Sequence, residues 1–129
     1  MDKTEKDIKI LISAKYPIIY IVSWEEERVE ESLIKIAENF QKNLLFWDSS
    51  NGFVNAFTNE KNAIQDPEAA VNYALRDDED NTVFAFKDLH HFMDSPRLIR
   101  KLRDLSKEVI QSAKSCVILS PVLKIPAAA

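Results

Sequence analysis

Glycine is the residue that this sequence has least of, with Gly52 alone among 129 residues. Average usage of roughly 7% would give about nine glycines in a chain of this length. The loops G-x-G-x-x-G and G-x-x-x-x-G-K-[ST], which cradle phosphate groups, need three and two glycines. A nucleotide site built on either loop is therefore excluded.

Cysteine and long apolar runs are equally scarce. The single Cys116 excludes an internal disulfide and a multi-cysteine zinc site, and the apolar residues 117–119 beside it predict a buried thiol. No apolar run approaches the ~20 residues that a membrane-spanning helix needs. Residues 1–7 are too charged for a secretory signal. We therefore expect no membrane association and a cytoplasmic location.

The charges that are present are unevenly distributed. The net charge is −4, but residues 1–96 carry 10 basic against 19 acidic side chains, and residues 97–129 carry 7 against 2. An acidic total makes nucleic acid an improbable general ligand. The basic end is compatible with a local docking surface for an acidic partner. At 46% hydrophobic residues and 14.8 kDa, residues 1–129 are expected to form one domain.

Hydrophobic periodicity alternates between helical and strand spacing along the chain. Four amphipathic helices are predicted at residues 2–15, from Ser23 to Phe40, from Asp66 onward and at 95–112, and four short apolar strands at 18–22, 44–47, 82–86 and 116–119. Residues 53–65 fit a loop or a partial strand, and residues 77–80 are a charged break. This order predicts an α/β fold, a three-layer α-β-α sandwich with a mostly parallel sheet of about four strands.

Two serines are predicted to cap helices. Ser95 precedes Pro96, which is the usual order of an N-cap and a first-turn proline. Ser23 precedes Glu25, Glu26 and Glu27, which the helix dipole favours in a first turn.

The carboxyl ends of the predicted strands are the expected ligand-binding edge of a parallel sheet. Ser23, Asp88 and Ser120 each follow one of these strands, so together they are the candidate pocket. Asp88 has two interpretations: a remnant magnesium or polar-network site, or a carboxylate that caps the following turn, which is the more common role. Asp88 after the apolar run 83–86 resembles the P-loop pattern, in which an active ATPase usually has a glutamate next to activate water; Leu89 stands at that position, so the resemblance implies no catalysis.

Residues 24–27 argue against phosphate in this pocket. The carboxylates of Glu25, Glu26 and Glu27 at a helix N-terminus repel phosphate, and Trp24 is expected to fill the space where backbone N–H groups would be open. His90 and His91 are the only histidines, and neighbours in a turn point in different directions. One is expected to be packed and one exposed, and no metal site is predicted.

The predicted helix at 95–112 carries a cluster of cations. Its members are Arg97, Arg100, Lys101, Arg103 and Lys107. Arg100, Arg103 and Lys107 share one face through their spacing of three and four residues. This face has two interpretations: a basic docking surface, or an ordinary solvated helix face partly offset by Asp104 and Glu108.

Three blocks of sequence resemble the start of the AAA-family ATPases encoded in plastid genomes and cyanobacteria. The blocks are residues 16–28, residues 86–90 with 96–105, and residues 120–126. The resemblance implies an N-terminal, degenerate P-loop (AAA/RecA-type) domain that precedes a complete AAA module. It also implies a strand order 5-1-4-3-2, with Asp88 at the position of the magnesium-binding aspartate and Ser120 near the polar sensor.

The sequence departs from the P-loop pattern in three ways. It has no Walker A sequence, no glutamate after Asp88 and no fifth strand. Residues 127–129 are interpreted as a truncation tail, so the sheet is expected to stop before that strand. The resemblance therefore implies no enzyme activity and no cofactor for this chain, with ATP and magnesium bound only by the separate module.

The first hypothesis is a non-catalytic regulatory or assembly domain of an AAA-family ATPase. It would act by protein contact, through the basic helix at 97–107 or the exposed edge of the first strand. Its partners would be other proteins, the parent ATPase module or a second copy, in the cytoplasm or the plastid stroma. One alternative is a weak nucleotide-binding domain with an unusual pocket near Ser23, Asp88 and Ser120. A second alternative is nucleic-acid docking through the helix at 97–107.

Overall fold

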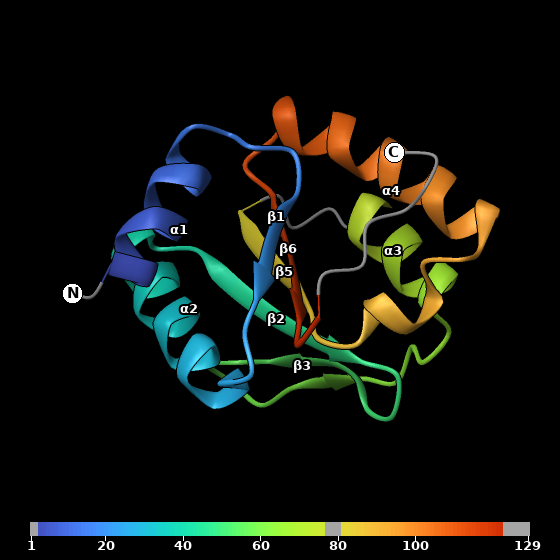
Figure 1. The fold of residues 1–129 in the computed structure, drawn as a ribbon, viewed down its shortest axis with the longest axis horizontal. Helices are drawn as coiled ribbons and strands as arrows, with labels where there is room; N and C mark the ends of the chain where they lie inside the picture. The colour runs from blue at the N-terminus through green and yellow to red at the C-terminus, as the bar shows by residue number, and fades with distance from the viewer. Residues whose placement is uncertain (1–2, 77–80, 123–129) are drawn as a thin grey trace.

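A six-stranded sheet runs through the middle of the molecule, with helices on both of its faces (Figure 1). The computed structural model describes residues 3–76 and 81–122. The strand order is β1-β6-β5-β2-β3-β4. Four neighbouring strands, with β1 at the edge, are parallel: β1 (Ile19–Val22), β6 (Ser115–Ser120), β5 (Thr82–Phe86) and β2 (Asn43–Asp48). β3 (Gly52–Asn55) and β4 (Lys61–Asn62) extend the sheet antiparallel beyond β2.

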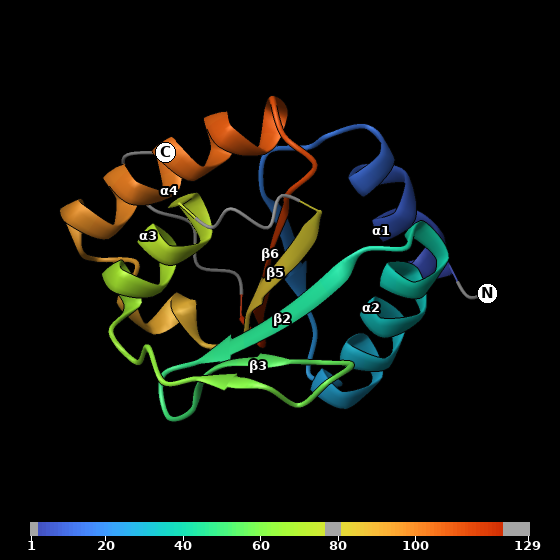
Figure 2. The same cartoon turned by 180° about the vertical axis from the view of Figure 1, so that it is seen from behind.

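The helices divide between the two faces. α1 (Lys3–Ser13) and α2 (Glu26–Phe40) cover one face, while α3 (Pro67–Arg76), α4 (Pro96–Ile110) and the 3-10 helix η1 (Leu89–Phe92) cover the other (Figures 1 and 2). The predicted three-layer α/β sandwich is confirmed. Within the described residues, no helix combines the length and the apolar character needed to cross a membrane.

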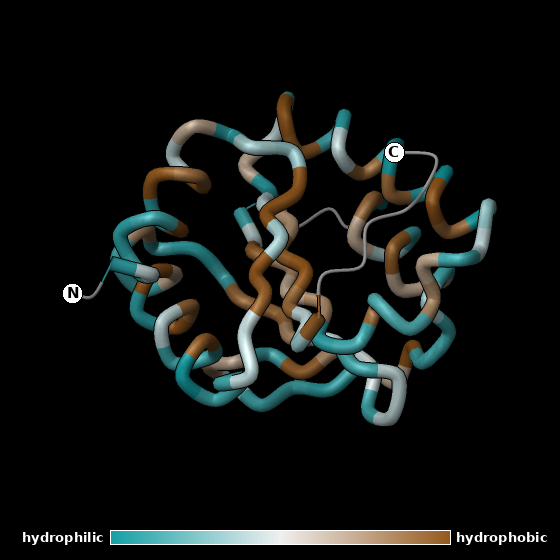
Figure 3. The backbone as a smooth tube through the Cα atoms, in the orientation of Figure 1, coloured by the Kyte–Doolittle hydropathy of each residue, from teal (hydrophilic) through white to brown (hydrophobic). Residues whose placement is uncertain are grey.

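The central strand β5 shows why a short apolar run becomes a buried parallel strand. Val83 and Ala85 join the core under α1 and α2, whereas Phe84 and Phe86 join the core under α3 and α4. Strand side chains alternate between faces, so a strand covered on both sides must be apolar at every position. Burying each large side chain contributes roughly 1.5–3 kcal/mol. Figure 3 shows the resulting hydrophobic colour along the central strands.

The sheet is wider than predicted. Residues 53–65 contain most of β3 and all of β4, so the partial-strand interpretation is the correct one, and the described residues form six strands rather than about four. The signal was weak because β4 is only two residues long. Counted along the chain, the four parallel strands are β1, β2, β5 and β6. Their order in the sheet is first, fourth, third, second, which agrees with the 1-4-3-2 part of the predicted order. The predictions about a fifth strand, the tail at 127–129 and the charged break at 77–80 fall outside the described residues.

The two predicted caps have different outcomes. Ser95 is the N-cap of α4, and its Oγ accepts a hydrogen bond from the Leu98 N–H at 3.2 Å. Ser23 is not the N-cap of α2, which begins at Glu26. The Ser23 N–H donates to the Ser120 carbonyl at 2.9 Å, so Ser23 still belongs to the sheet ladder. Its Oγ instead accepts from the Glu25 N–H at 3.1 Å in a tight turn before the helix.

Candidate functional site

The carboxyl ends of β1 and β6 place Ser23 and Ser120 side by side. Val22 and Ser120 are register partners, and the Ser23 N–H donates to the Ser120 carbonyl at 2.9 Å. The Ser120 side chain is fully buried. Its hydroxyl bonds to the Val122 carbonyl and accepts from the Val122 N–H at 3.1 Å. This hydroxyl therefore holds the chain as it leaves β6.

Asp88 is directed to a different part of the same edge. Its two carboxylate oxygens each lie 3.1 Å from the Ser49 backbone nitrogen, and Oδ2 also accepts from the Ser49 hydroxyl at 2.7 Å. It makes no side-chain cap to η1, so the capping interpretation of Asp88 is wrong. The carboxylate joins the end of β5 to the turn after β2. A hollow of about 200 Å³ beside Ser23 is lined by neither Asp88 nor Ser120.

Other polar side chains of this edge are also engaged within the chain. Partial burial of Asp48 works against ionisation, but hydrogen bonds from Asn51 and Ser50 and the nearby Lys87 hold its pKa below the usual value. The Lys87 Nζ lies 3.4 Å from the Glu30 carboxylate, between β5 and α2. Sequence reasoning missed this pair and the Ser49 contact. The Asp-Ser-Ser-Asn run at 48–51 is a turn signal. It indicates a polar turn around Ser49 but not the contact of Ser49 with Asp88.

Trp24 is the most exposed large hydrophobic residue among those described, with 83% of its surface accessible. The expectation that it fills the phosphate position is wrong, because the indole lies in solvent. Val22 and Val122 are nearly half exposed at the same end of the sheet. This edge therefore presents an apolar cluster beside the acidic start of α2. Indole groups left in water in this way are more common at contact surfaces than elsewhere.

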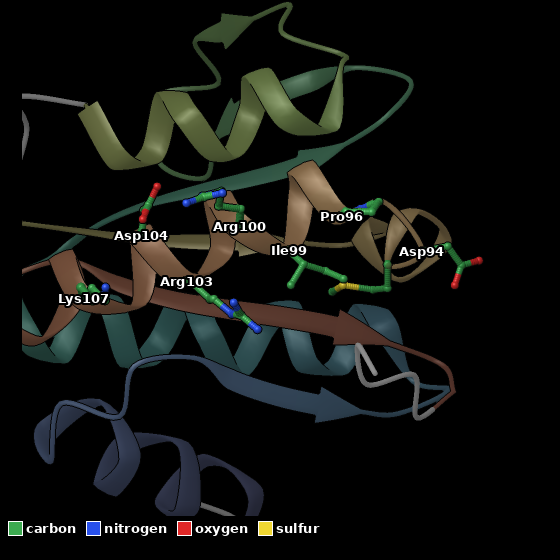
Figure 4. A pocket seen from close by; sticks show the side chains of 8 residues that line it. Asp94, Pro96, Ile99, Arg100, Arg103, Asp104 and Lys107 are labelled. Carbon is green, nitrogen blue, oxygen red and sulfur yellow. The ribbon is translucent and has the colours of Figure 1, made fainter. Parts of the chain in front are cut away.

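The five cations of α4 divide into two sets. Arg97 pairs with Glu68 at 3.2 Å and Lys101 donates to Asn72 at 3.3 Å, so both contact α3. The other three side chains line an open hollow of about 580 Å³ on the outer face of α4 (Figure 4). Its lining consists of Arg100, Arg103, Lys107, Met93, Asp94, Pro96, Ile99 and Asp104. One end of the hollow is apolar, and the rest is lined by the cationic side chains Arg100, Arg103 and Lys107 of α4 together with Asp104.

The remaining sequence predictions of this region concern His90, His91 and Cys116. One histidine is buried and one exposed, as predicted, namely His90 and His91, but the expectation that they point in different directions is wrong, because their ring centroids lie 4.0 Å apart. Cys116 is buried as predicted, and burial raises the pKa of its thiol to about 12. Within residues 3–76 and 81–122, no group of three or more His, Cys, Asp or Glu side chains could hold a metal ion.

The fold and this edge define an α/β domain of the three-layer, mostly parallel class. The family model described as "SpoVK-like AAA ATPase, N-terminal domain" matches residues 4–128. Because the match covers nearly the whole chain, the chain belongs to this family of N-terminal domains.

Curated relatives agree with this assignment. The chain is 35% identical over 123 residues to an AAA domain-containing protein ycf46 of Guillardia theta, covering 94% of the chain and 24% of the relative. It is 32% identical over 126 residues to the ycf46 protein of Trieres chinensis, covering 96% and 25%. The ycf46 protein of Gracilaria tenuistipitata var. liui is 29% identical over 124 residues, covering 95% and 25%. The chain thus spans about a quarter of the length of these relatives.

Proposed function

We propose that this chain is a non-catalytic regulatory or assembly domain of an AAA-family ATPase and that it acts by protein contact. One observation carries the proposal: three cations of α4 line an open hollow, while the polar groups of the sheet edge contact each other. Solvent-facing cations next to apolar surface are suited to a protein partner. We place the protein in the cytoplasm, or in the plastid stroma where it is plastid-encoded.

The sheet edge supports a non-catalytic role. With Gly52 as its sole glycine, the sequence has no phosphate loop of the Walker A type. The Asp88 carboxylate is held by Ser49, and Glu26 and Glu27 lie in the first turn of α2, where a phosphate would meet like charge. ATP and magnesium would bind to a separate AAA module of the longer protein.

Calorimetry with magnesium-ATP and magnesium-ADP tests the nucleotide side of this proposal. We expect no binding heat from the 129-residue chain and no rise in its melting temperature. If a nucleotide binds in an unusual pocket near Ser23, Asp88 and Ser120, the opposite result is expected. The nucleotide should then raise the melting temperature, and Asp88→Ala should abolish this rise. That result would replace the proposal with a nucleotide-binding function.

Charge reversal on α4 tests the contact side. Arg100→Glu with Arg103→Glu should alter the ATPase rate or assembly of the full-length AAA protein, because both side chains line the hollow. Lys61→Glu on β4 is the matched control, since it reverses an exposed cation at the far edge of the sheet. No difference between the two variants would contradict the proposal. Nucleic-acid binding that falls steeply with salt and disappears in the double variant would instead indicate nucleic-acid docking.

A further inference from the structure

Two surfaces of opposite charge lie on opposite faces of this domain. The basic hollow, as defined by its eight lining residues above, is on the outer side of α4. The acidic start of α2, residues 24–27, lies on the other side of the sheet (Figure 1). The sheet separates the two surfaces, so they cannot meet within one molecule. Each can meet its complement only on another molecule.

The lining of the basic hollow holds three cations and two carboxylates, Asp94 and Asp104, and two of the cations form no ion pair within the described residues. Arg100 and Lys107 are exposed and form no ion pair within the described residues, in contrast to Arg97, which pairs with Glu68. Met93, Pro96 and Ile99 form the apolar end of the hollow near the start of α4. Along the helix, Arg100 and Lys107 lie about 10 Å apart at 1.5 Å per residue. A fitting partner therefore has an apolar anchor followed, within about 10 Å, by negative charge.

Residues 24–27 have that composition, an apolar side chain followed closely by acids. Trp24 is 83% exposed, and Glu26 and Glu27 are exposed acids without an ion pair in the described part of the chain. Glu25 pairs with Arg28 at 3.1 Å, but both side chains are more than half exposed, so this pair is weak. Glu26 and Glu27 lie in the first turn of α2, two and three residues after Trp24, so these acids follow the indole within at most about 10 Å. Indole against the guanidinium of an exposed arginine is a favourable contact.

We propose that residues 24–27 of one copy dock into the basic hollow of a second copy. Trp24 packs on Pro96 and Ile99, and the two glutamates face the cations of α4. The contact joins different surfaces of the two copies, so it is heterologous and leaves one free surface at each end of a pair. This inference rests on the proposed protein-contact function and names its partner as the same chain.

A mixing experiment with two charge-reversed variants tests the contact. Variant one carries Glu26→Lys and Glu27→Lys, and variant two carries Arg100→Glu and Arg103→Glu. Each variant alone presents like charges on both surfaces, whereas an equimolar mixture restores opposite charges at every contact. Sedimentation velocity from about 10 μM to about 1 mM covers the range of a weak contact. We expect wild-type self-association, at least about tenfold weaker association of each variant alone, and its return in the mixture.

Three further variants and a salt comparison complete the design. Trp24→Ala should weaken association at least about tenfold, as for a central aromatic anchor, and Trp24→Phe should retain part of it. Glu38→Lys, near the far end of α2, is the charge control and should associate like the wild type. Raising NaCl from about 50 mM to about 500 mM should weaken the contact.

Specific outcomes would overturn the inference. A wild-type chain that stays monomeric at low salt excludes the contact, and so does a mixture that fails to associate while both variants keep the wild-type circular dichroism spectrum. Self-association that Trp24→Ala leaves unchanged would exclude residues 24–27 as the docked segment. If copies do not associate but Arg100→Glu with Arg103→Glu still alters the full-length protein, the proposed function survives and only the identity of the partner fails.

Discussion

The carboxylate of Asp88 accepts hydrogen bonds from both the backbone N–H and the hydroxyl of Ser49, 39 residues earlier in the chain. This contact fastens the carboxyl end of β5 to the turn after β2, its neighbour in the sheet. A carboxylate with these partners is a structural connector between two strands. Of the sequence interpretations of Asp88, a remnant magnesium or polar-network site or a local cap, these hydrogen bonds fit the polar network, and they connect distant segments of the chain.

Replacing Asp88 with alanine should destabilise the fold. The Ser49 N–H and hydroxyl lose their acceptor in a partly buried site, which costs about 1–3 kcal/mol of the free energy of unfolding. Urea denaturation measures this loss. Asp7→Asn, on the exposed side of α1, is the control and should change stability by less than about 0.5 kcal/mol. Equal stability of Asp88→Ala and wild type would contradict the structural role.

The sole glycine is expected to be indispensable to the β3–β4 part of the sheet. Gly52 has a φ of +77°, and a Cβ there would lie 2.4 Å from the Asn62 carbonyl oxygen. Gly52→Ala combines backbone strain with overpacking against rigid backbone, at a cost of roughly 2–5 kcal/mol. Asn59→Gly, at another positive-φ position (62°), should be neutral or slightly stabilising. Urea midpoints of both variants check this, and a near-neutral Gly52→Ala would refute it.

Cys116 should make stability fall at alkaline pH. Burial raises the pKa of the thiol from 9.0 to about 12, so above pH 9 the unfolded chain releases a proton that the folded chain keeps. The folded state is then disfavoured as pH rises between these values, by up to about 1.4 kcal/mol per pH unit. The difference in unfolding free energy between wild type and Cys116→Ala, measured from pH 8 to about 11, should shrink as pH rises. A constant difference would count against the raised pKa.

The two tryptophans should report opposite environments. Trp24 is largely in solvent, whereas Trp47 is fully buried and its Nε1–H donates to the Ile64 carbonyl at 2.8 Å. Trp47→Phe should leave a red-shifted emission that acrylamide quenches readily. Trp24→Phe should leave a blue-shifted emission that is poorly quenched, with stability changed by less than about 0.5 kcal/mol. Similar quenching of both variants would show that the indole of Trp24 is covered.

Local features of the chain determined much of the fold. The apolar run in β5, the Ser95-Pro96 start of α4 and the apolar neighbours of Cys116 each predicted their structure correctly, because strand burial and helix capping depend on nearby residues. β4 was less predictable because two residues carry no periodicity. The order of the parallel strands came from the resemblance to a family, and the pairings agree with it.

By itself the sequence determined the alternation of helices and strands, the scarcity of glycine and the concentration of positive charge on one helix. Only the tertiary structure decided how those groups are used. It joined Asp88 to Ser49, directed Arg97 to Glu68 and left Arg100 facing solvent. The reason is physical: periodicity and capping act over a few residues, whereas these contacts depend on which strands and helices become neighbours once both faces of the sheet are covered.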